Sequence, residues 1–350
     1  MPHEPTQASA DDLVRRTQAC DSLGELVEVS AGLPDLQVKL VARAATFREI
    51  GEAVSGVTDA LTRRLLALAE RDLGAPPASY GWLACGSQAR REQAVVSDQD
   101  NALMLGGELR SESDHRYFEA LTAAVNDGLA ACGFPRCRGG VMASNPTWRQ
   151  PYDGWQAHFD GWIDRPTTHA LMHATIFFDM RVVTGDDAPV RRLHEHVRDR
   201  VRGNHIFLKL MAANAIDVRP PLGFLGRIAT IAEGDHAGTF DVKKAGIMPV
   251  VDLARVHALA AGSLALGTLE RLEHAALARV LSDEGAAELA QAFELSASLR
   301  SRHQVRQLSA GLAPDNFLRP DELTSEELGG LRQAFRVIRR HQDVMAQRYG

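Results

Sequence analysis

Two aspartates separated by one residue, Asp98 and Asp100, are the residues whose types and spacing best fit metal chemistry. In an extended chain the side chains of residues i and i+2 point the same way, so both carboxylates would face one side and Gln99 would face the other. Two like charges this close repel each other unless a cation lies between them. Mg²⁺ or Mn²⁺ takes oxygen ligands and keeps positions open for phosphate oxygens. The pair therefore predicts a divalent-ion site.

A glycine–serine bend precedes the aspartates at Gly86 and Ser87. Glycine lets the backbone approach a ligand closely, and serine adds a hydroxyl group. A helix that begins at this bend would point free N–H groups and its positive end at the same place, which suits a triphosphate. Arg90, about one turn further on, could bind a phosphate with two hydrogen bonds. We therefore expect the bend to bind a polyphosphate beside the ion.

The elements that must position these residues are short strands separated by polar segments. The apolar run 80–85 predicts a strand that ends at the bend, and 88–94 is compatible with a helix. The run 95–105 predicts a second strand that carries both aspartates. A helix over 118–131 and a third strand at 139–143 are expected to follow.

The rest of the chain has helical periodicity. Apolar positions in 36–54 predict one helix, and those in 61–73 predict a second, which the glycine and prolines of 74–77 end. After Pro151 the pattern is helical almost to the end, where 328–345 carries an apolar stripe. The predicted fold class is α+β and predominantly helical, with one small mixed sheet.

Composition excludes several classes of protein. The 39 basic and 45 acidic residues give a net charge of -6, which argues against an extended basic face for nucleic acid. The four cysteines form no Cys-x-x-Cys pair, so we expect a reducing, cytoplasmic location. The first five residues lack a signal-peptide pattern, and the apolar stretch 256–269 is shorter than the ~20 residues of a bilayer span, so no membrane partner is expected.

Other candidate sites are weaker. His169 and His173 share a helix face and could be drawn as a metal cluster with Asp179, but packed or capping histidines fit the context better. Cys132 and Cys137 lack the second pair that a zinc site needs, so we interpret them as core thiols. The sequence contains no P-loop motif, and none of its 13 histidines is followed by aspartate, as in HD-type phosphohydrolases.

At the glycine–serine bend and the Asp-x-Asp pair the chain resembles the polymerase-β-type nucleotidyltransferase superfamily. It resembles more closely a family of signal-transduction nucleotidyltransferases, which are often fused to CBS and cyclic-nucleotide-binding domains. These are relatives of the uridylyltransferase that modifies the nitrogen-signalling PII protein. The resemblance covers residues 30–348 and includes separated motifs in order, among them Glu92-Gln93, 137–146, Phe178-Asp-Met-Arg181, 220–223, Asp241-Val-Lys243 and 314–316.

The resemblance implies transfer of a nucleoside monophosphate from an NTP to an acceptor. Asp98 and Asp100 would be catalytic and hold Mg²⁺ or Mn²⁺. The nucleotide-binding residues would be Gly86, Ser87, Arg90 and Lys243, the last of which matches a family position. The expected domains are an N-terminal helical segment, 1–75, a nucleotidyltransferase domain, 76–195, and a C-terminal helical substrate-binding domain, 196–350.

Several alternatives stay open. The superfamily carries a third carboxylate on a later strand, but the predicted strand 139–143 has none. Asp160 or Asp164 would fill this role, or the site uses two carboxylates. A non-catalytic nucleotide-binding module that signals through a partner protein is the alternative function. The sequence does not indicate whether the acceptor is a protein tyrosine, a small molecule or the end of a nucleic acid, which NTP is used, or whether the chain forms a homo-oligomer.

Overall fold

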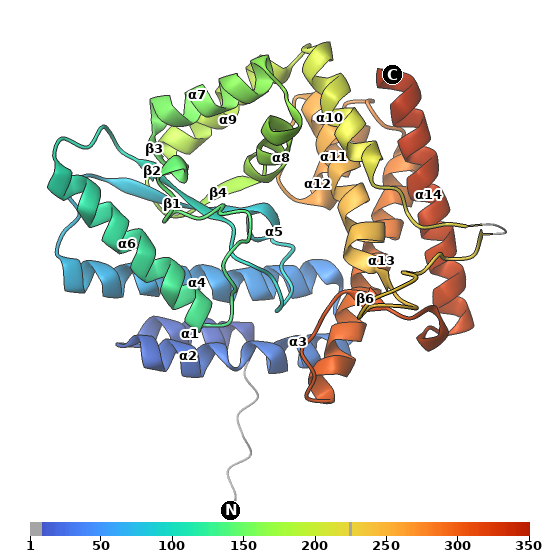
Figure 1. Ribbon diagram of the computed structural model, residues 1–350, viewed down its shortest axis with the longest axis horizontal. Coiled ribbons are helices and arrows are strands. Elements are labelled where there is room, and N and C mark those ends of the chain that lie inside the picture. Colours follow the sequence, from blue (N-terminus) through green and yellow to red (C-terminus); the bar gives the residue numbers. More distant parts are fainter. Residues whose placement is uncertain (1–8, 224–225) are drawn as a thin grey trace, which may run out of the picture. The chain divides into compact units, whose positions relative to one another are not determined.

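The computed structural model describes residues 9–223 and 226–350, and the chain divides into two compact units (Figure 1). The first unit comprises the residues up to His158 together with Asp179–Leu193, and the second comprises Phe159–Phe178 and His194–Gly350. The predicted N-terminal segment 1–75 and the signal-peptide analysis both begin in residues 1–8, which lie outside the described residues. The predicted domain boundaries at 75/76 and 195/196 stay predictions.

The first unit contains a small mixed sheet. Its strands are β1 (Tyr80–Cys85), β2 (Asn101–Leu105), β3 (Arg149–Pro151) and β4 (Met180–Gly185), in the order β3-β2-β1-β4. Strand β1 pairs antiparallel with β2 and β4, while β2 and β3 are parallel. Both inner strands are apolar and almost entirely buried, as expected for strands covered on both faces. The α+β, predominantly helical fold class is confirmed.

Two strand predictions need correction, and two strands of this sheet were not predicted. The predicted strand 95–105 begins only at Asn101, although Gln99 forms an isolated bridge with Arg136. The predicted strand 139–143 is a loop, even though the carbonyl of Val141 accepts a hydrogen bond from the amide of Asn101 at 3.1 Å. Strands β3 and β4 were not predicted, because β3 spans only three residues and the partners of both strands are distant in sequence.

The helices of this unit share their apolar core with the sheet. They are α1 (Ala10–Ala19), α2 (Leu23–Ser30), α3 (Leu33–Ala42), α4 (Phe47–Leu73), the single turn α5 (Gly86–Ala89) and α6 (Glu112–Ala131). One apolar cluster runs from Leu13 and Leu26, through α4, to Trp82 and Leu103 of the sheet. The N-terminal helices are therefore packed into the core that supports β1 and β2.

Helix α4 corrects the predicted break near residues 54–61. The break lies instead at Arg43–Thr46, where Ala44 has a φ of +58° and Thr46 forms a capping box with Glu49. Both features end one helix and start another, whereas Ser55-Gly56, the turn signal between 54 and 61, lies inside α4. Gly74, with a φ of +88°, ends α4 where the sequence predicts.

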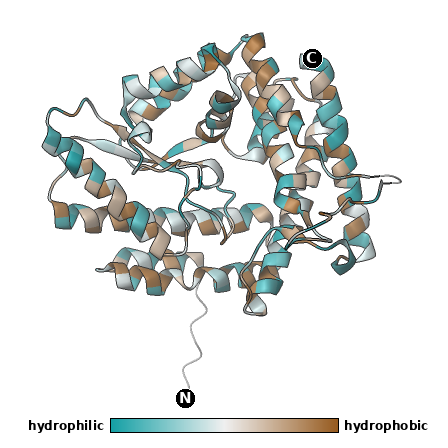
Figure 2. Ribbon diagram, viewed as in Figure 1, coloured by the Kyte–Doolittle hydropathy of each residue, from teal (hydrophilic) through white to brown (hydrophobic). Residues whose placement is uncertain are grey.

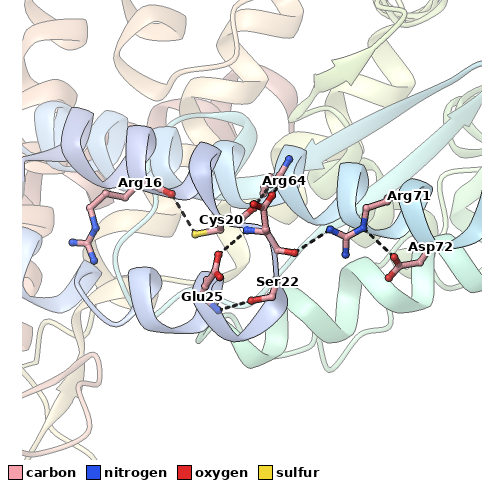
Figure 3. A network of polar contacts seen from close by, with 8 residues as sticks. Arg16, Cys20, Ser22, Glu25, Arg64, Arg71 and Asp72 are labelled. Carbon is pink, nitrogen blue, oxygen red and sulfur yellow. Dashed lines mark hydrogen bonds and ion pairs between the residues drawn. The ribbon is translucent and has the colours of Figure 1, made fainter.

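Polar contacts attach α4 to the turn between α1 and α2 (Figure 3). Arg64 donates to the carbonyl of Cys20 and pairs with Asp21 at 2.7 Å. Arg71 donates to the carbonyl of Asp21 at 3.0 Å. These bonds satisfy turn carbonyls that no helix pairs, so they fix α1 and α2 along α4.

The second unit is predominantly helical. It contains α8 (Thr168–Phe177), α10 (His205–Asp217), η3 (Lys243–Ile247), α11 (Met248–Ala261), α12 (Thr268–Leu277), α13 (Asp283–Ser309), η4 (Pro320–Glu322), α14 (Ser325–Tyr349) and the β5–β6 pair (Phe240–Asp241 and Phe317–Leu318). Helices α7 (Tyr152–Asp164) and α9 (Ala188–Val201) contribute residues to both units, and η1 (Pro146–Trp148) belongs to the first.

The predicted apolar stripe of α14 is buried at Leu331, Phe335, Ile338 and Met345. Figure 2 shows apolar and polar residues interspersed along this helix, as expected for one buried and one solvated face. None of the helices in the described part of the chain is long and apolar enough to cross a bilayer.

We expect acid to destabilise the second unit through His257 on α11. Burial, with the nearby Arg348 and His341, lowers the pKa of His257 to about 4. The unfolded chain takes up this proton near its ordinary pKa of about 6.5, so the stabilisation is complete above that pH and is lost as pH falls toward 4. Between about pH 7 and about pH 5 this histidine should cost the fold about 2 kcal/mol. Urea unfolding at both pH values should show a smaller pH dependence for His257→Gln than for the unmodified chain, and an equal dependence would contradict this.

Candidate active site

Strand β1 ends in a bend that only glycine fits well. Gly86 has a φ of +57°, and its amide donates to the carbonyl of Asp179 at 2.9 Å. A Cβ atom at this position would lie 3.0 Å from a carboxylate oxygen of Asp100, so the lack of a side chain brings the bend close to that carboxylate. Ser87 is the one residue of 86–90 that is not buried.

The helix expected after the bend is only one turn long. Helix α5 spans Gly86–Ala89, and Arg91, with a φ of +58°, follows it. The macrodipole of a long helix is therefore missing, and any anion at the bend must be bound mainly by local groups.

The two aspartates lie on the same side of the chain, as their spacing predicts. Asp98 is exposed and Asp100 is half-buried, whereas Gln99 between them is 3% exposed. The carbonyl of Asp100 accepts a hydrogen bond from the amide of Cys85 at 2.9 Å, which holds this segment beside the end of β1. The carboxylates therefore meet next to the Gly86 bend.

A third ligand type joins the carboxylates. One oxygen each of Asp98 and Asp100 and the Sγ atom of Cys137 lie within 4.8 Å of one another. Within residues 9–223 and 226–350 this is the one group of three histidine, cysteine or acidic side chains with such spacing. The alternative cluster of His169, His173 and Asp179 does not have it.

Amide side chains hold the Cys137 loop in place. Gln99 and Asn101, which face away from the site, both accept hydrogen bonds from Asn126 of α6, at 2.7 and 2.9 Å. The side-chain oxygen of Asn101 also accepts from the amide of Ala143 at 2.8 Å, and that of Asn126 from the amide of Ser144 at 3.0 Å. Alternate residues of one segment thus face the site and anchor the loop opposite it.

We expect Asn126→Ala to destabilise the protein by about 3 kcal/mol. The substitution leaves two buried amide oxygens and one backbone N–H without this partner, and each such loss costs about 1–3 kcal/mol at most. Urea unfolding measures the change. Asp127→Ala, on the neighbouring exposed position, is the control and should change stability by less than about 0.5 kcal/mol. Equal effects of the two substitutions would contradict the network's role.

Cys137 is not a core thiol, in contrast to the sequence interpretation, while Cys132 is buried. Burial, and then the charge and hydrogen bond of Asp100, raise the pKa of Cys137 to about 11. The thiol therefore stays protonated at neutral pH and is a poor nucleophile. The one feature of the sequence that could have marked Cys137 as a site residue was its position in a glycine-containing loop after a helix. The spacing rules for zinc motifs do not identify a single cysteine of this kind.

Two protein-family models match the chain. Residues 31–169 match the family described as "Putative nucleotidyltransferase DUF294", and residues 205–349 match the "Putative nucleotidyltransferase substrate binding domain". The chain belongs to this nucleotidyltransferase family. No curated protein matches it. The region matched by the nucleotidyltransferase model contains the Gly86 bend, both aspartates and Cys137.

Arg90 of the nucleotidyltransferase domain has partners that differ from the predicted phosphate. Its guanidinium donates to Asp179 at 2.6 Å and to Glu92 at 2.7 Å, and the side chains of Arg90 and Asp179 are 7% and 0% exposed. Asp179 directly precedes β4, so this buried pair joins the segment after the bend to β4 at the edge of the sheet. The geometry favours a positioning role for Arg90.

Helix α4 contacts the residues that follow the glycine bend of the nucleotidyltransferase domain. Asp59, 3% exposed, accepts hydrogen bonds from Gln88 and Arg181, each at 2.9 Å. Gly51 lies so close that a Cβ atom there would be 2.3 Å from the carbonyl oxygen of Arg91. These contacts fix both ends of the segment that follows β1.

The remaining predicted residues lie in the second unit. Asp160 accepts hydrogen bonds from His196 and Arg200, and Asp164 pairs with Arg200, so both carboxylates have cationic partners there. Lys243 begins η3, within the region matched by the substrate-binding model. Its role in nucleotide binding stays a prediction.

Proposed function

We propose that the chain transfers a nucleoside monophosphate from an NTP to an acceptor and releases pyrophosphate, using a divalent ion held by Asp98 and Asp100. The observation that carries the proposal is the meeting of two accessible carboxylates beside a bend at whose glycine a Cβ atom would lie 3.0 Å from one of them. The family match supports nucleotidyl transfer as the type of reaction.

The donor set fits Mg²⁺ or Mn²⁺. The carboxylate oxygens of Asp98 and Asp100 are close enough to share one ion, and their mutual repulsion is relieved when a cation binds. Bound there, the ion would neutralise charge on the phosphate oxygens in the transition state. We propose the same ligands for either ion, because both prefer oxygen.

The chain's own residues would supply positioning. The Gly86 bend lets a polyphosphate approach the backbone beside Asp100, and Ser87 would donate its hydroxyl to a phosphate oxygen. The contacts of Arg90 and Asp59 keep this bend rigid before the substrate binds. Lys243 would contact the nucleotide, and the substrate-binding domain would present the acceptor, a protein of a signalling pathway or a small molecule.

A labelling experiment tests this function. The purified chain is incubated with each of the four NTPs, labelled at the α-phosphate, in cell lysate with Mg²⁺ or Mn²⁺. We expect label on one acceptor and release of pyrophosphate, both stopped by EDTA. Label that persists in EDTA, or no pyrophosphate with any NTP, would overturn the proposal.

A non-catalytic nucleotide-binding module is the second candidate. It is favoured by one observation, that the third member of the site is a thiol and not a carboxylate. Calorimetric titration of NTPs with and without Mg²⁺ separates the two functions when it is combined with a pyrophosphate assay. Metal-dependent binding without turnover indicates the module.

A further inference from the structure

The third side chain at the proposed ion site is a sulfur donor. Sγ of Cys137 lies within 4.8 Å of ligand oxygens from both Asp98 and Asp100. Carboxylate oxygens suit Mg²⁺ and Mn²⁺, whereas sulfur favours softer ions such as Zn²⁺ and Cd²⁺. A site with both donor types is therefore not selective for hard ions alone.

The fold holds this thiol in place on both sides. The amide of Gln99 donates to the carbonyl of Pro135 at 2.9 Å, and the amide of Asn101 donates to the carbonyl of Val141 at 3.1 Å. The carbonyl of Cys137 also accepts from the amide of Gly140 at 3.1 Å. The loop that carries Cys137 is thus bonded, before and after the cysteine, to the segment that carries the aspartates.

The contact is accessible to an ion. Asp98 is exposed, and Asp100 and Cys137 are both partly exposed. A thiol that served only to fill the core would be buried like Cys132, which lies in the apolar cluster of the N-terminal helices. Cys137 instead lies where its sulfur and two carboxylates converge from different segments of the chain.

We propose that Cys137 is a third ligand of this site, so that a thiophilic divalent ion binds through Asp98, Asp100 and the Cys137 sulfur and displaces the activating ion. The inference rests on the proposed function. Binding converts the thiol to a metal-bound thiolate, with one S–H bond broken, one sulfur–metal bond formed and the proton released to solvent. No electron is transferred. Zn²⁺ or a similar ion would thus inhibit an enzyme that Mg²⁺ activates.

Cd²⁺ is the probe for the sulfur ligand, because a cadmium–thiolate bond absorbs in the ultraviolet through charge transfer. The full chain titrated with Cd²⁺ should show this absorption, saturating at one equivalent. Cys137→Ser should abolish the absorption and weaken Cd²⁺ binding about 10-fold to 100-fold. Losing a residue that only hydrogen-bonds a metal ligand costs about this much, and losing a ligand should cost no less. Cys132→Ser, the matched control, should keep the absorption and the affinity. Calorimetry of the unmodified chain in buffers of different ionisation enthalpy should detect one proton released, which needs no variant.

Two results obtained with the variants would overturn the proposal. One is charge-transfer absorption that persists in Cys137→Ser. The other is that Asp98→Asn with Asp100→Asn keeps the absorption and the full affinity for Cd²⁺, because the sulfur would then bind the ion without the carboxylates.

Mn²⁺ binding by electron paramagnetic resonance and pyrophosphate release with Mg²⁺ are measured separately on the same proteins. If both fail in the unmodified chain while Cd²⁺ absorption appears, the proposed function is wrong but the sulfur ligand stands. If both hold and the absorption is missing, only the sulfur ligand is wrong.

Discussion

Asp98→Asn combined with Asp100→Asn is expected to reduce pyrophosphate release about 10³-fold or more and to abolish Mn²⁺ binding. The two amides keep the shape of the side chains but remove both negative charges that attract the ion. A metal ion contributes several kcal/mol of transition-state stabilisation, and each 1.36 kcal/mol is about tenfold in rate. Steady-state turnover and electron paramagnetic resonance of Mn²⁺ measure the two effects.

The control for this double substitution is Asp72→Asn, an exposed aspartate that pairs with Arg71 near the end of α4. It should leave turnover and Mn²⁺ binding unchanged. Thermal unfolding should be similar for all three proteins, because Asp98 is exposed and Asp100 partly so. Full activity in the double variant would show that the reaction centre lies elsewhere.

Arg90→Met is expected to have the largest effect on stability, a loss of about 3–5 kcal/mol. The substitution leaves the fully buried carboxylate of Asp179 without the cation that donates to it at 2.6 Å. Removing one partner of a buried ion pair is costly because the other charge stays in a medium that solvates it poorly. Urea unfolding of the full chain measures the loss.

Arg91→Met is the matched control, since Arg91 is the next residue and its side chain is exposed. Its stability should stay within about 0.5 kcal/mol of the unmodified chain. Adding Asp179→Asn to Arg90→Met should recover part of the loss, because no buried charge then remains at that position. Unchanged stability in Arg90→Met, together with a raised KM for NTP, would instead support the phosphate-binding role predicted from the sequence.

Local patterns in the sequence were sufficient to predict the arrangement of the two aspartates and the glycine bend. Alternation along an extended chain predicts that Asp98 and Asp100 face one side, and the structure confirms it. The Gly86 bend was predictable because glycine after an apolar run has few other uses. The capping box at Thr46 is also a local signal, but the apolar periodicity on either side of it concealed the break.

What the sequence could not predict depends on contacts between distant segments. Strand β4 pairs with β1, which lies about a hundred residues earlier in the chain. The six residues of β4 do not by themselves distinguish a strand from the end of a helix. Arg90 looks like a phosphate ligand until Asp179 is placed beside it. Cys137 as a single cysteine predicts no site. Its position beside the aspartates follows only from the hydrogen bonds that Gln99 and Asn101 make to its loop.

The alternation of Asp98, Gln99, Asp100 and Asn101 also restricts how this stretch can evolve. Inserting or deleting a single residue just upstream would exchange the two faces, so that amides would face the proposed ion site and carboxylates would face the loop that contains Ala143. Point substitutions that preserve chemistry can accumulate at either set of positions. A change of length by one residue would damage the proposed ion site and the loop anchor together, so the spacing of this segment should tolerate less variation across descendants than its individual side chains do.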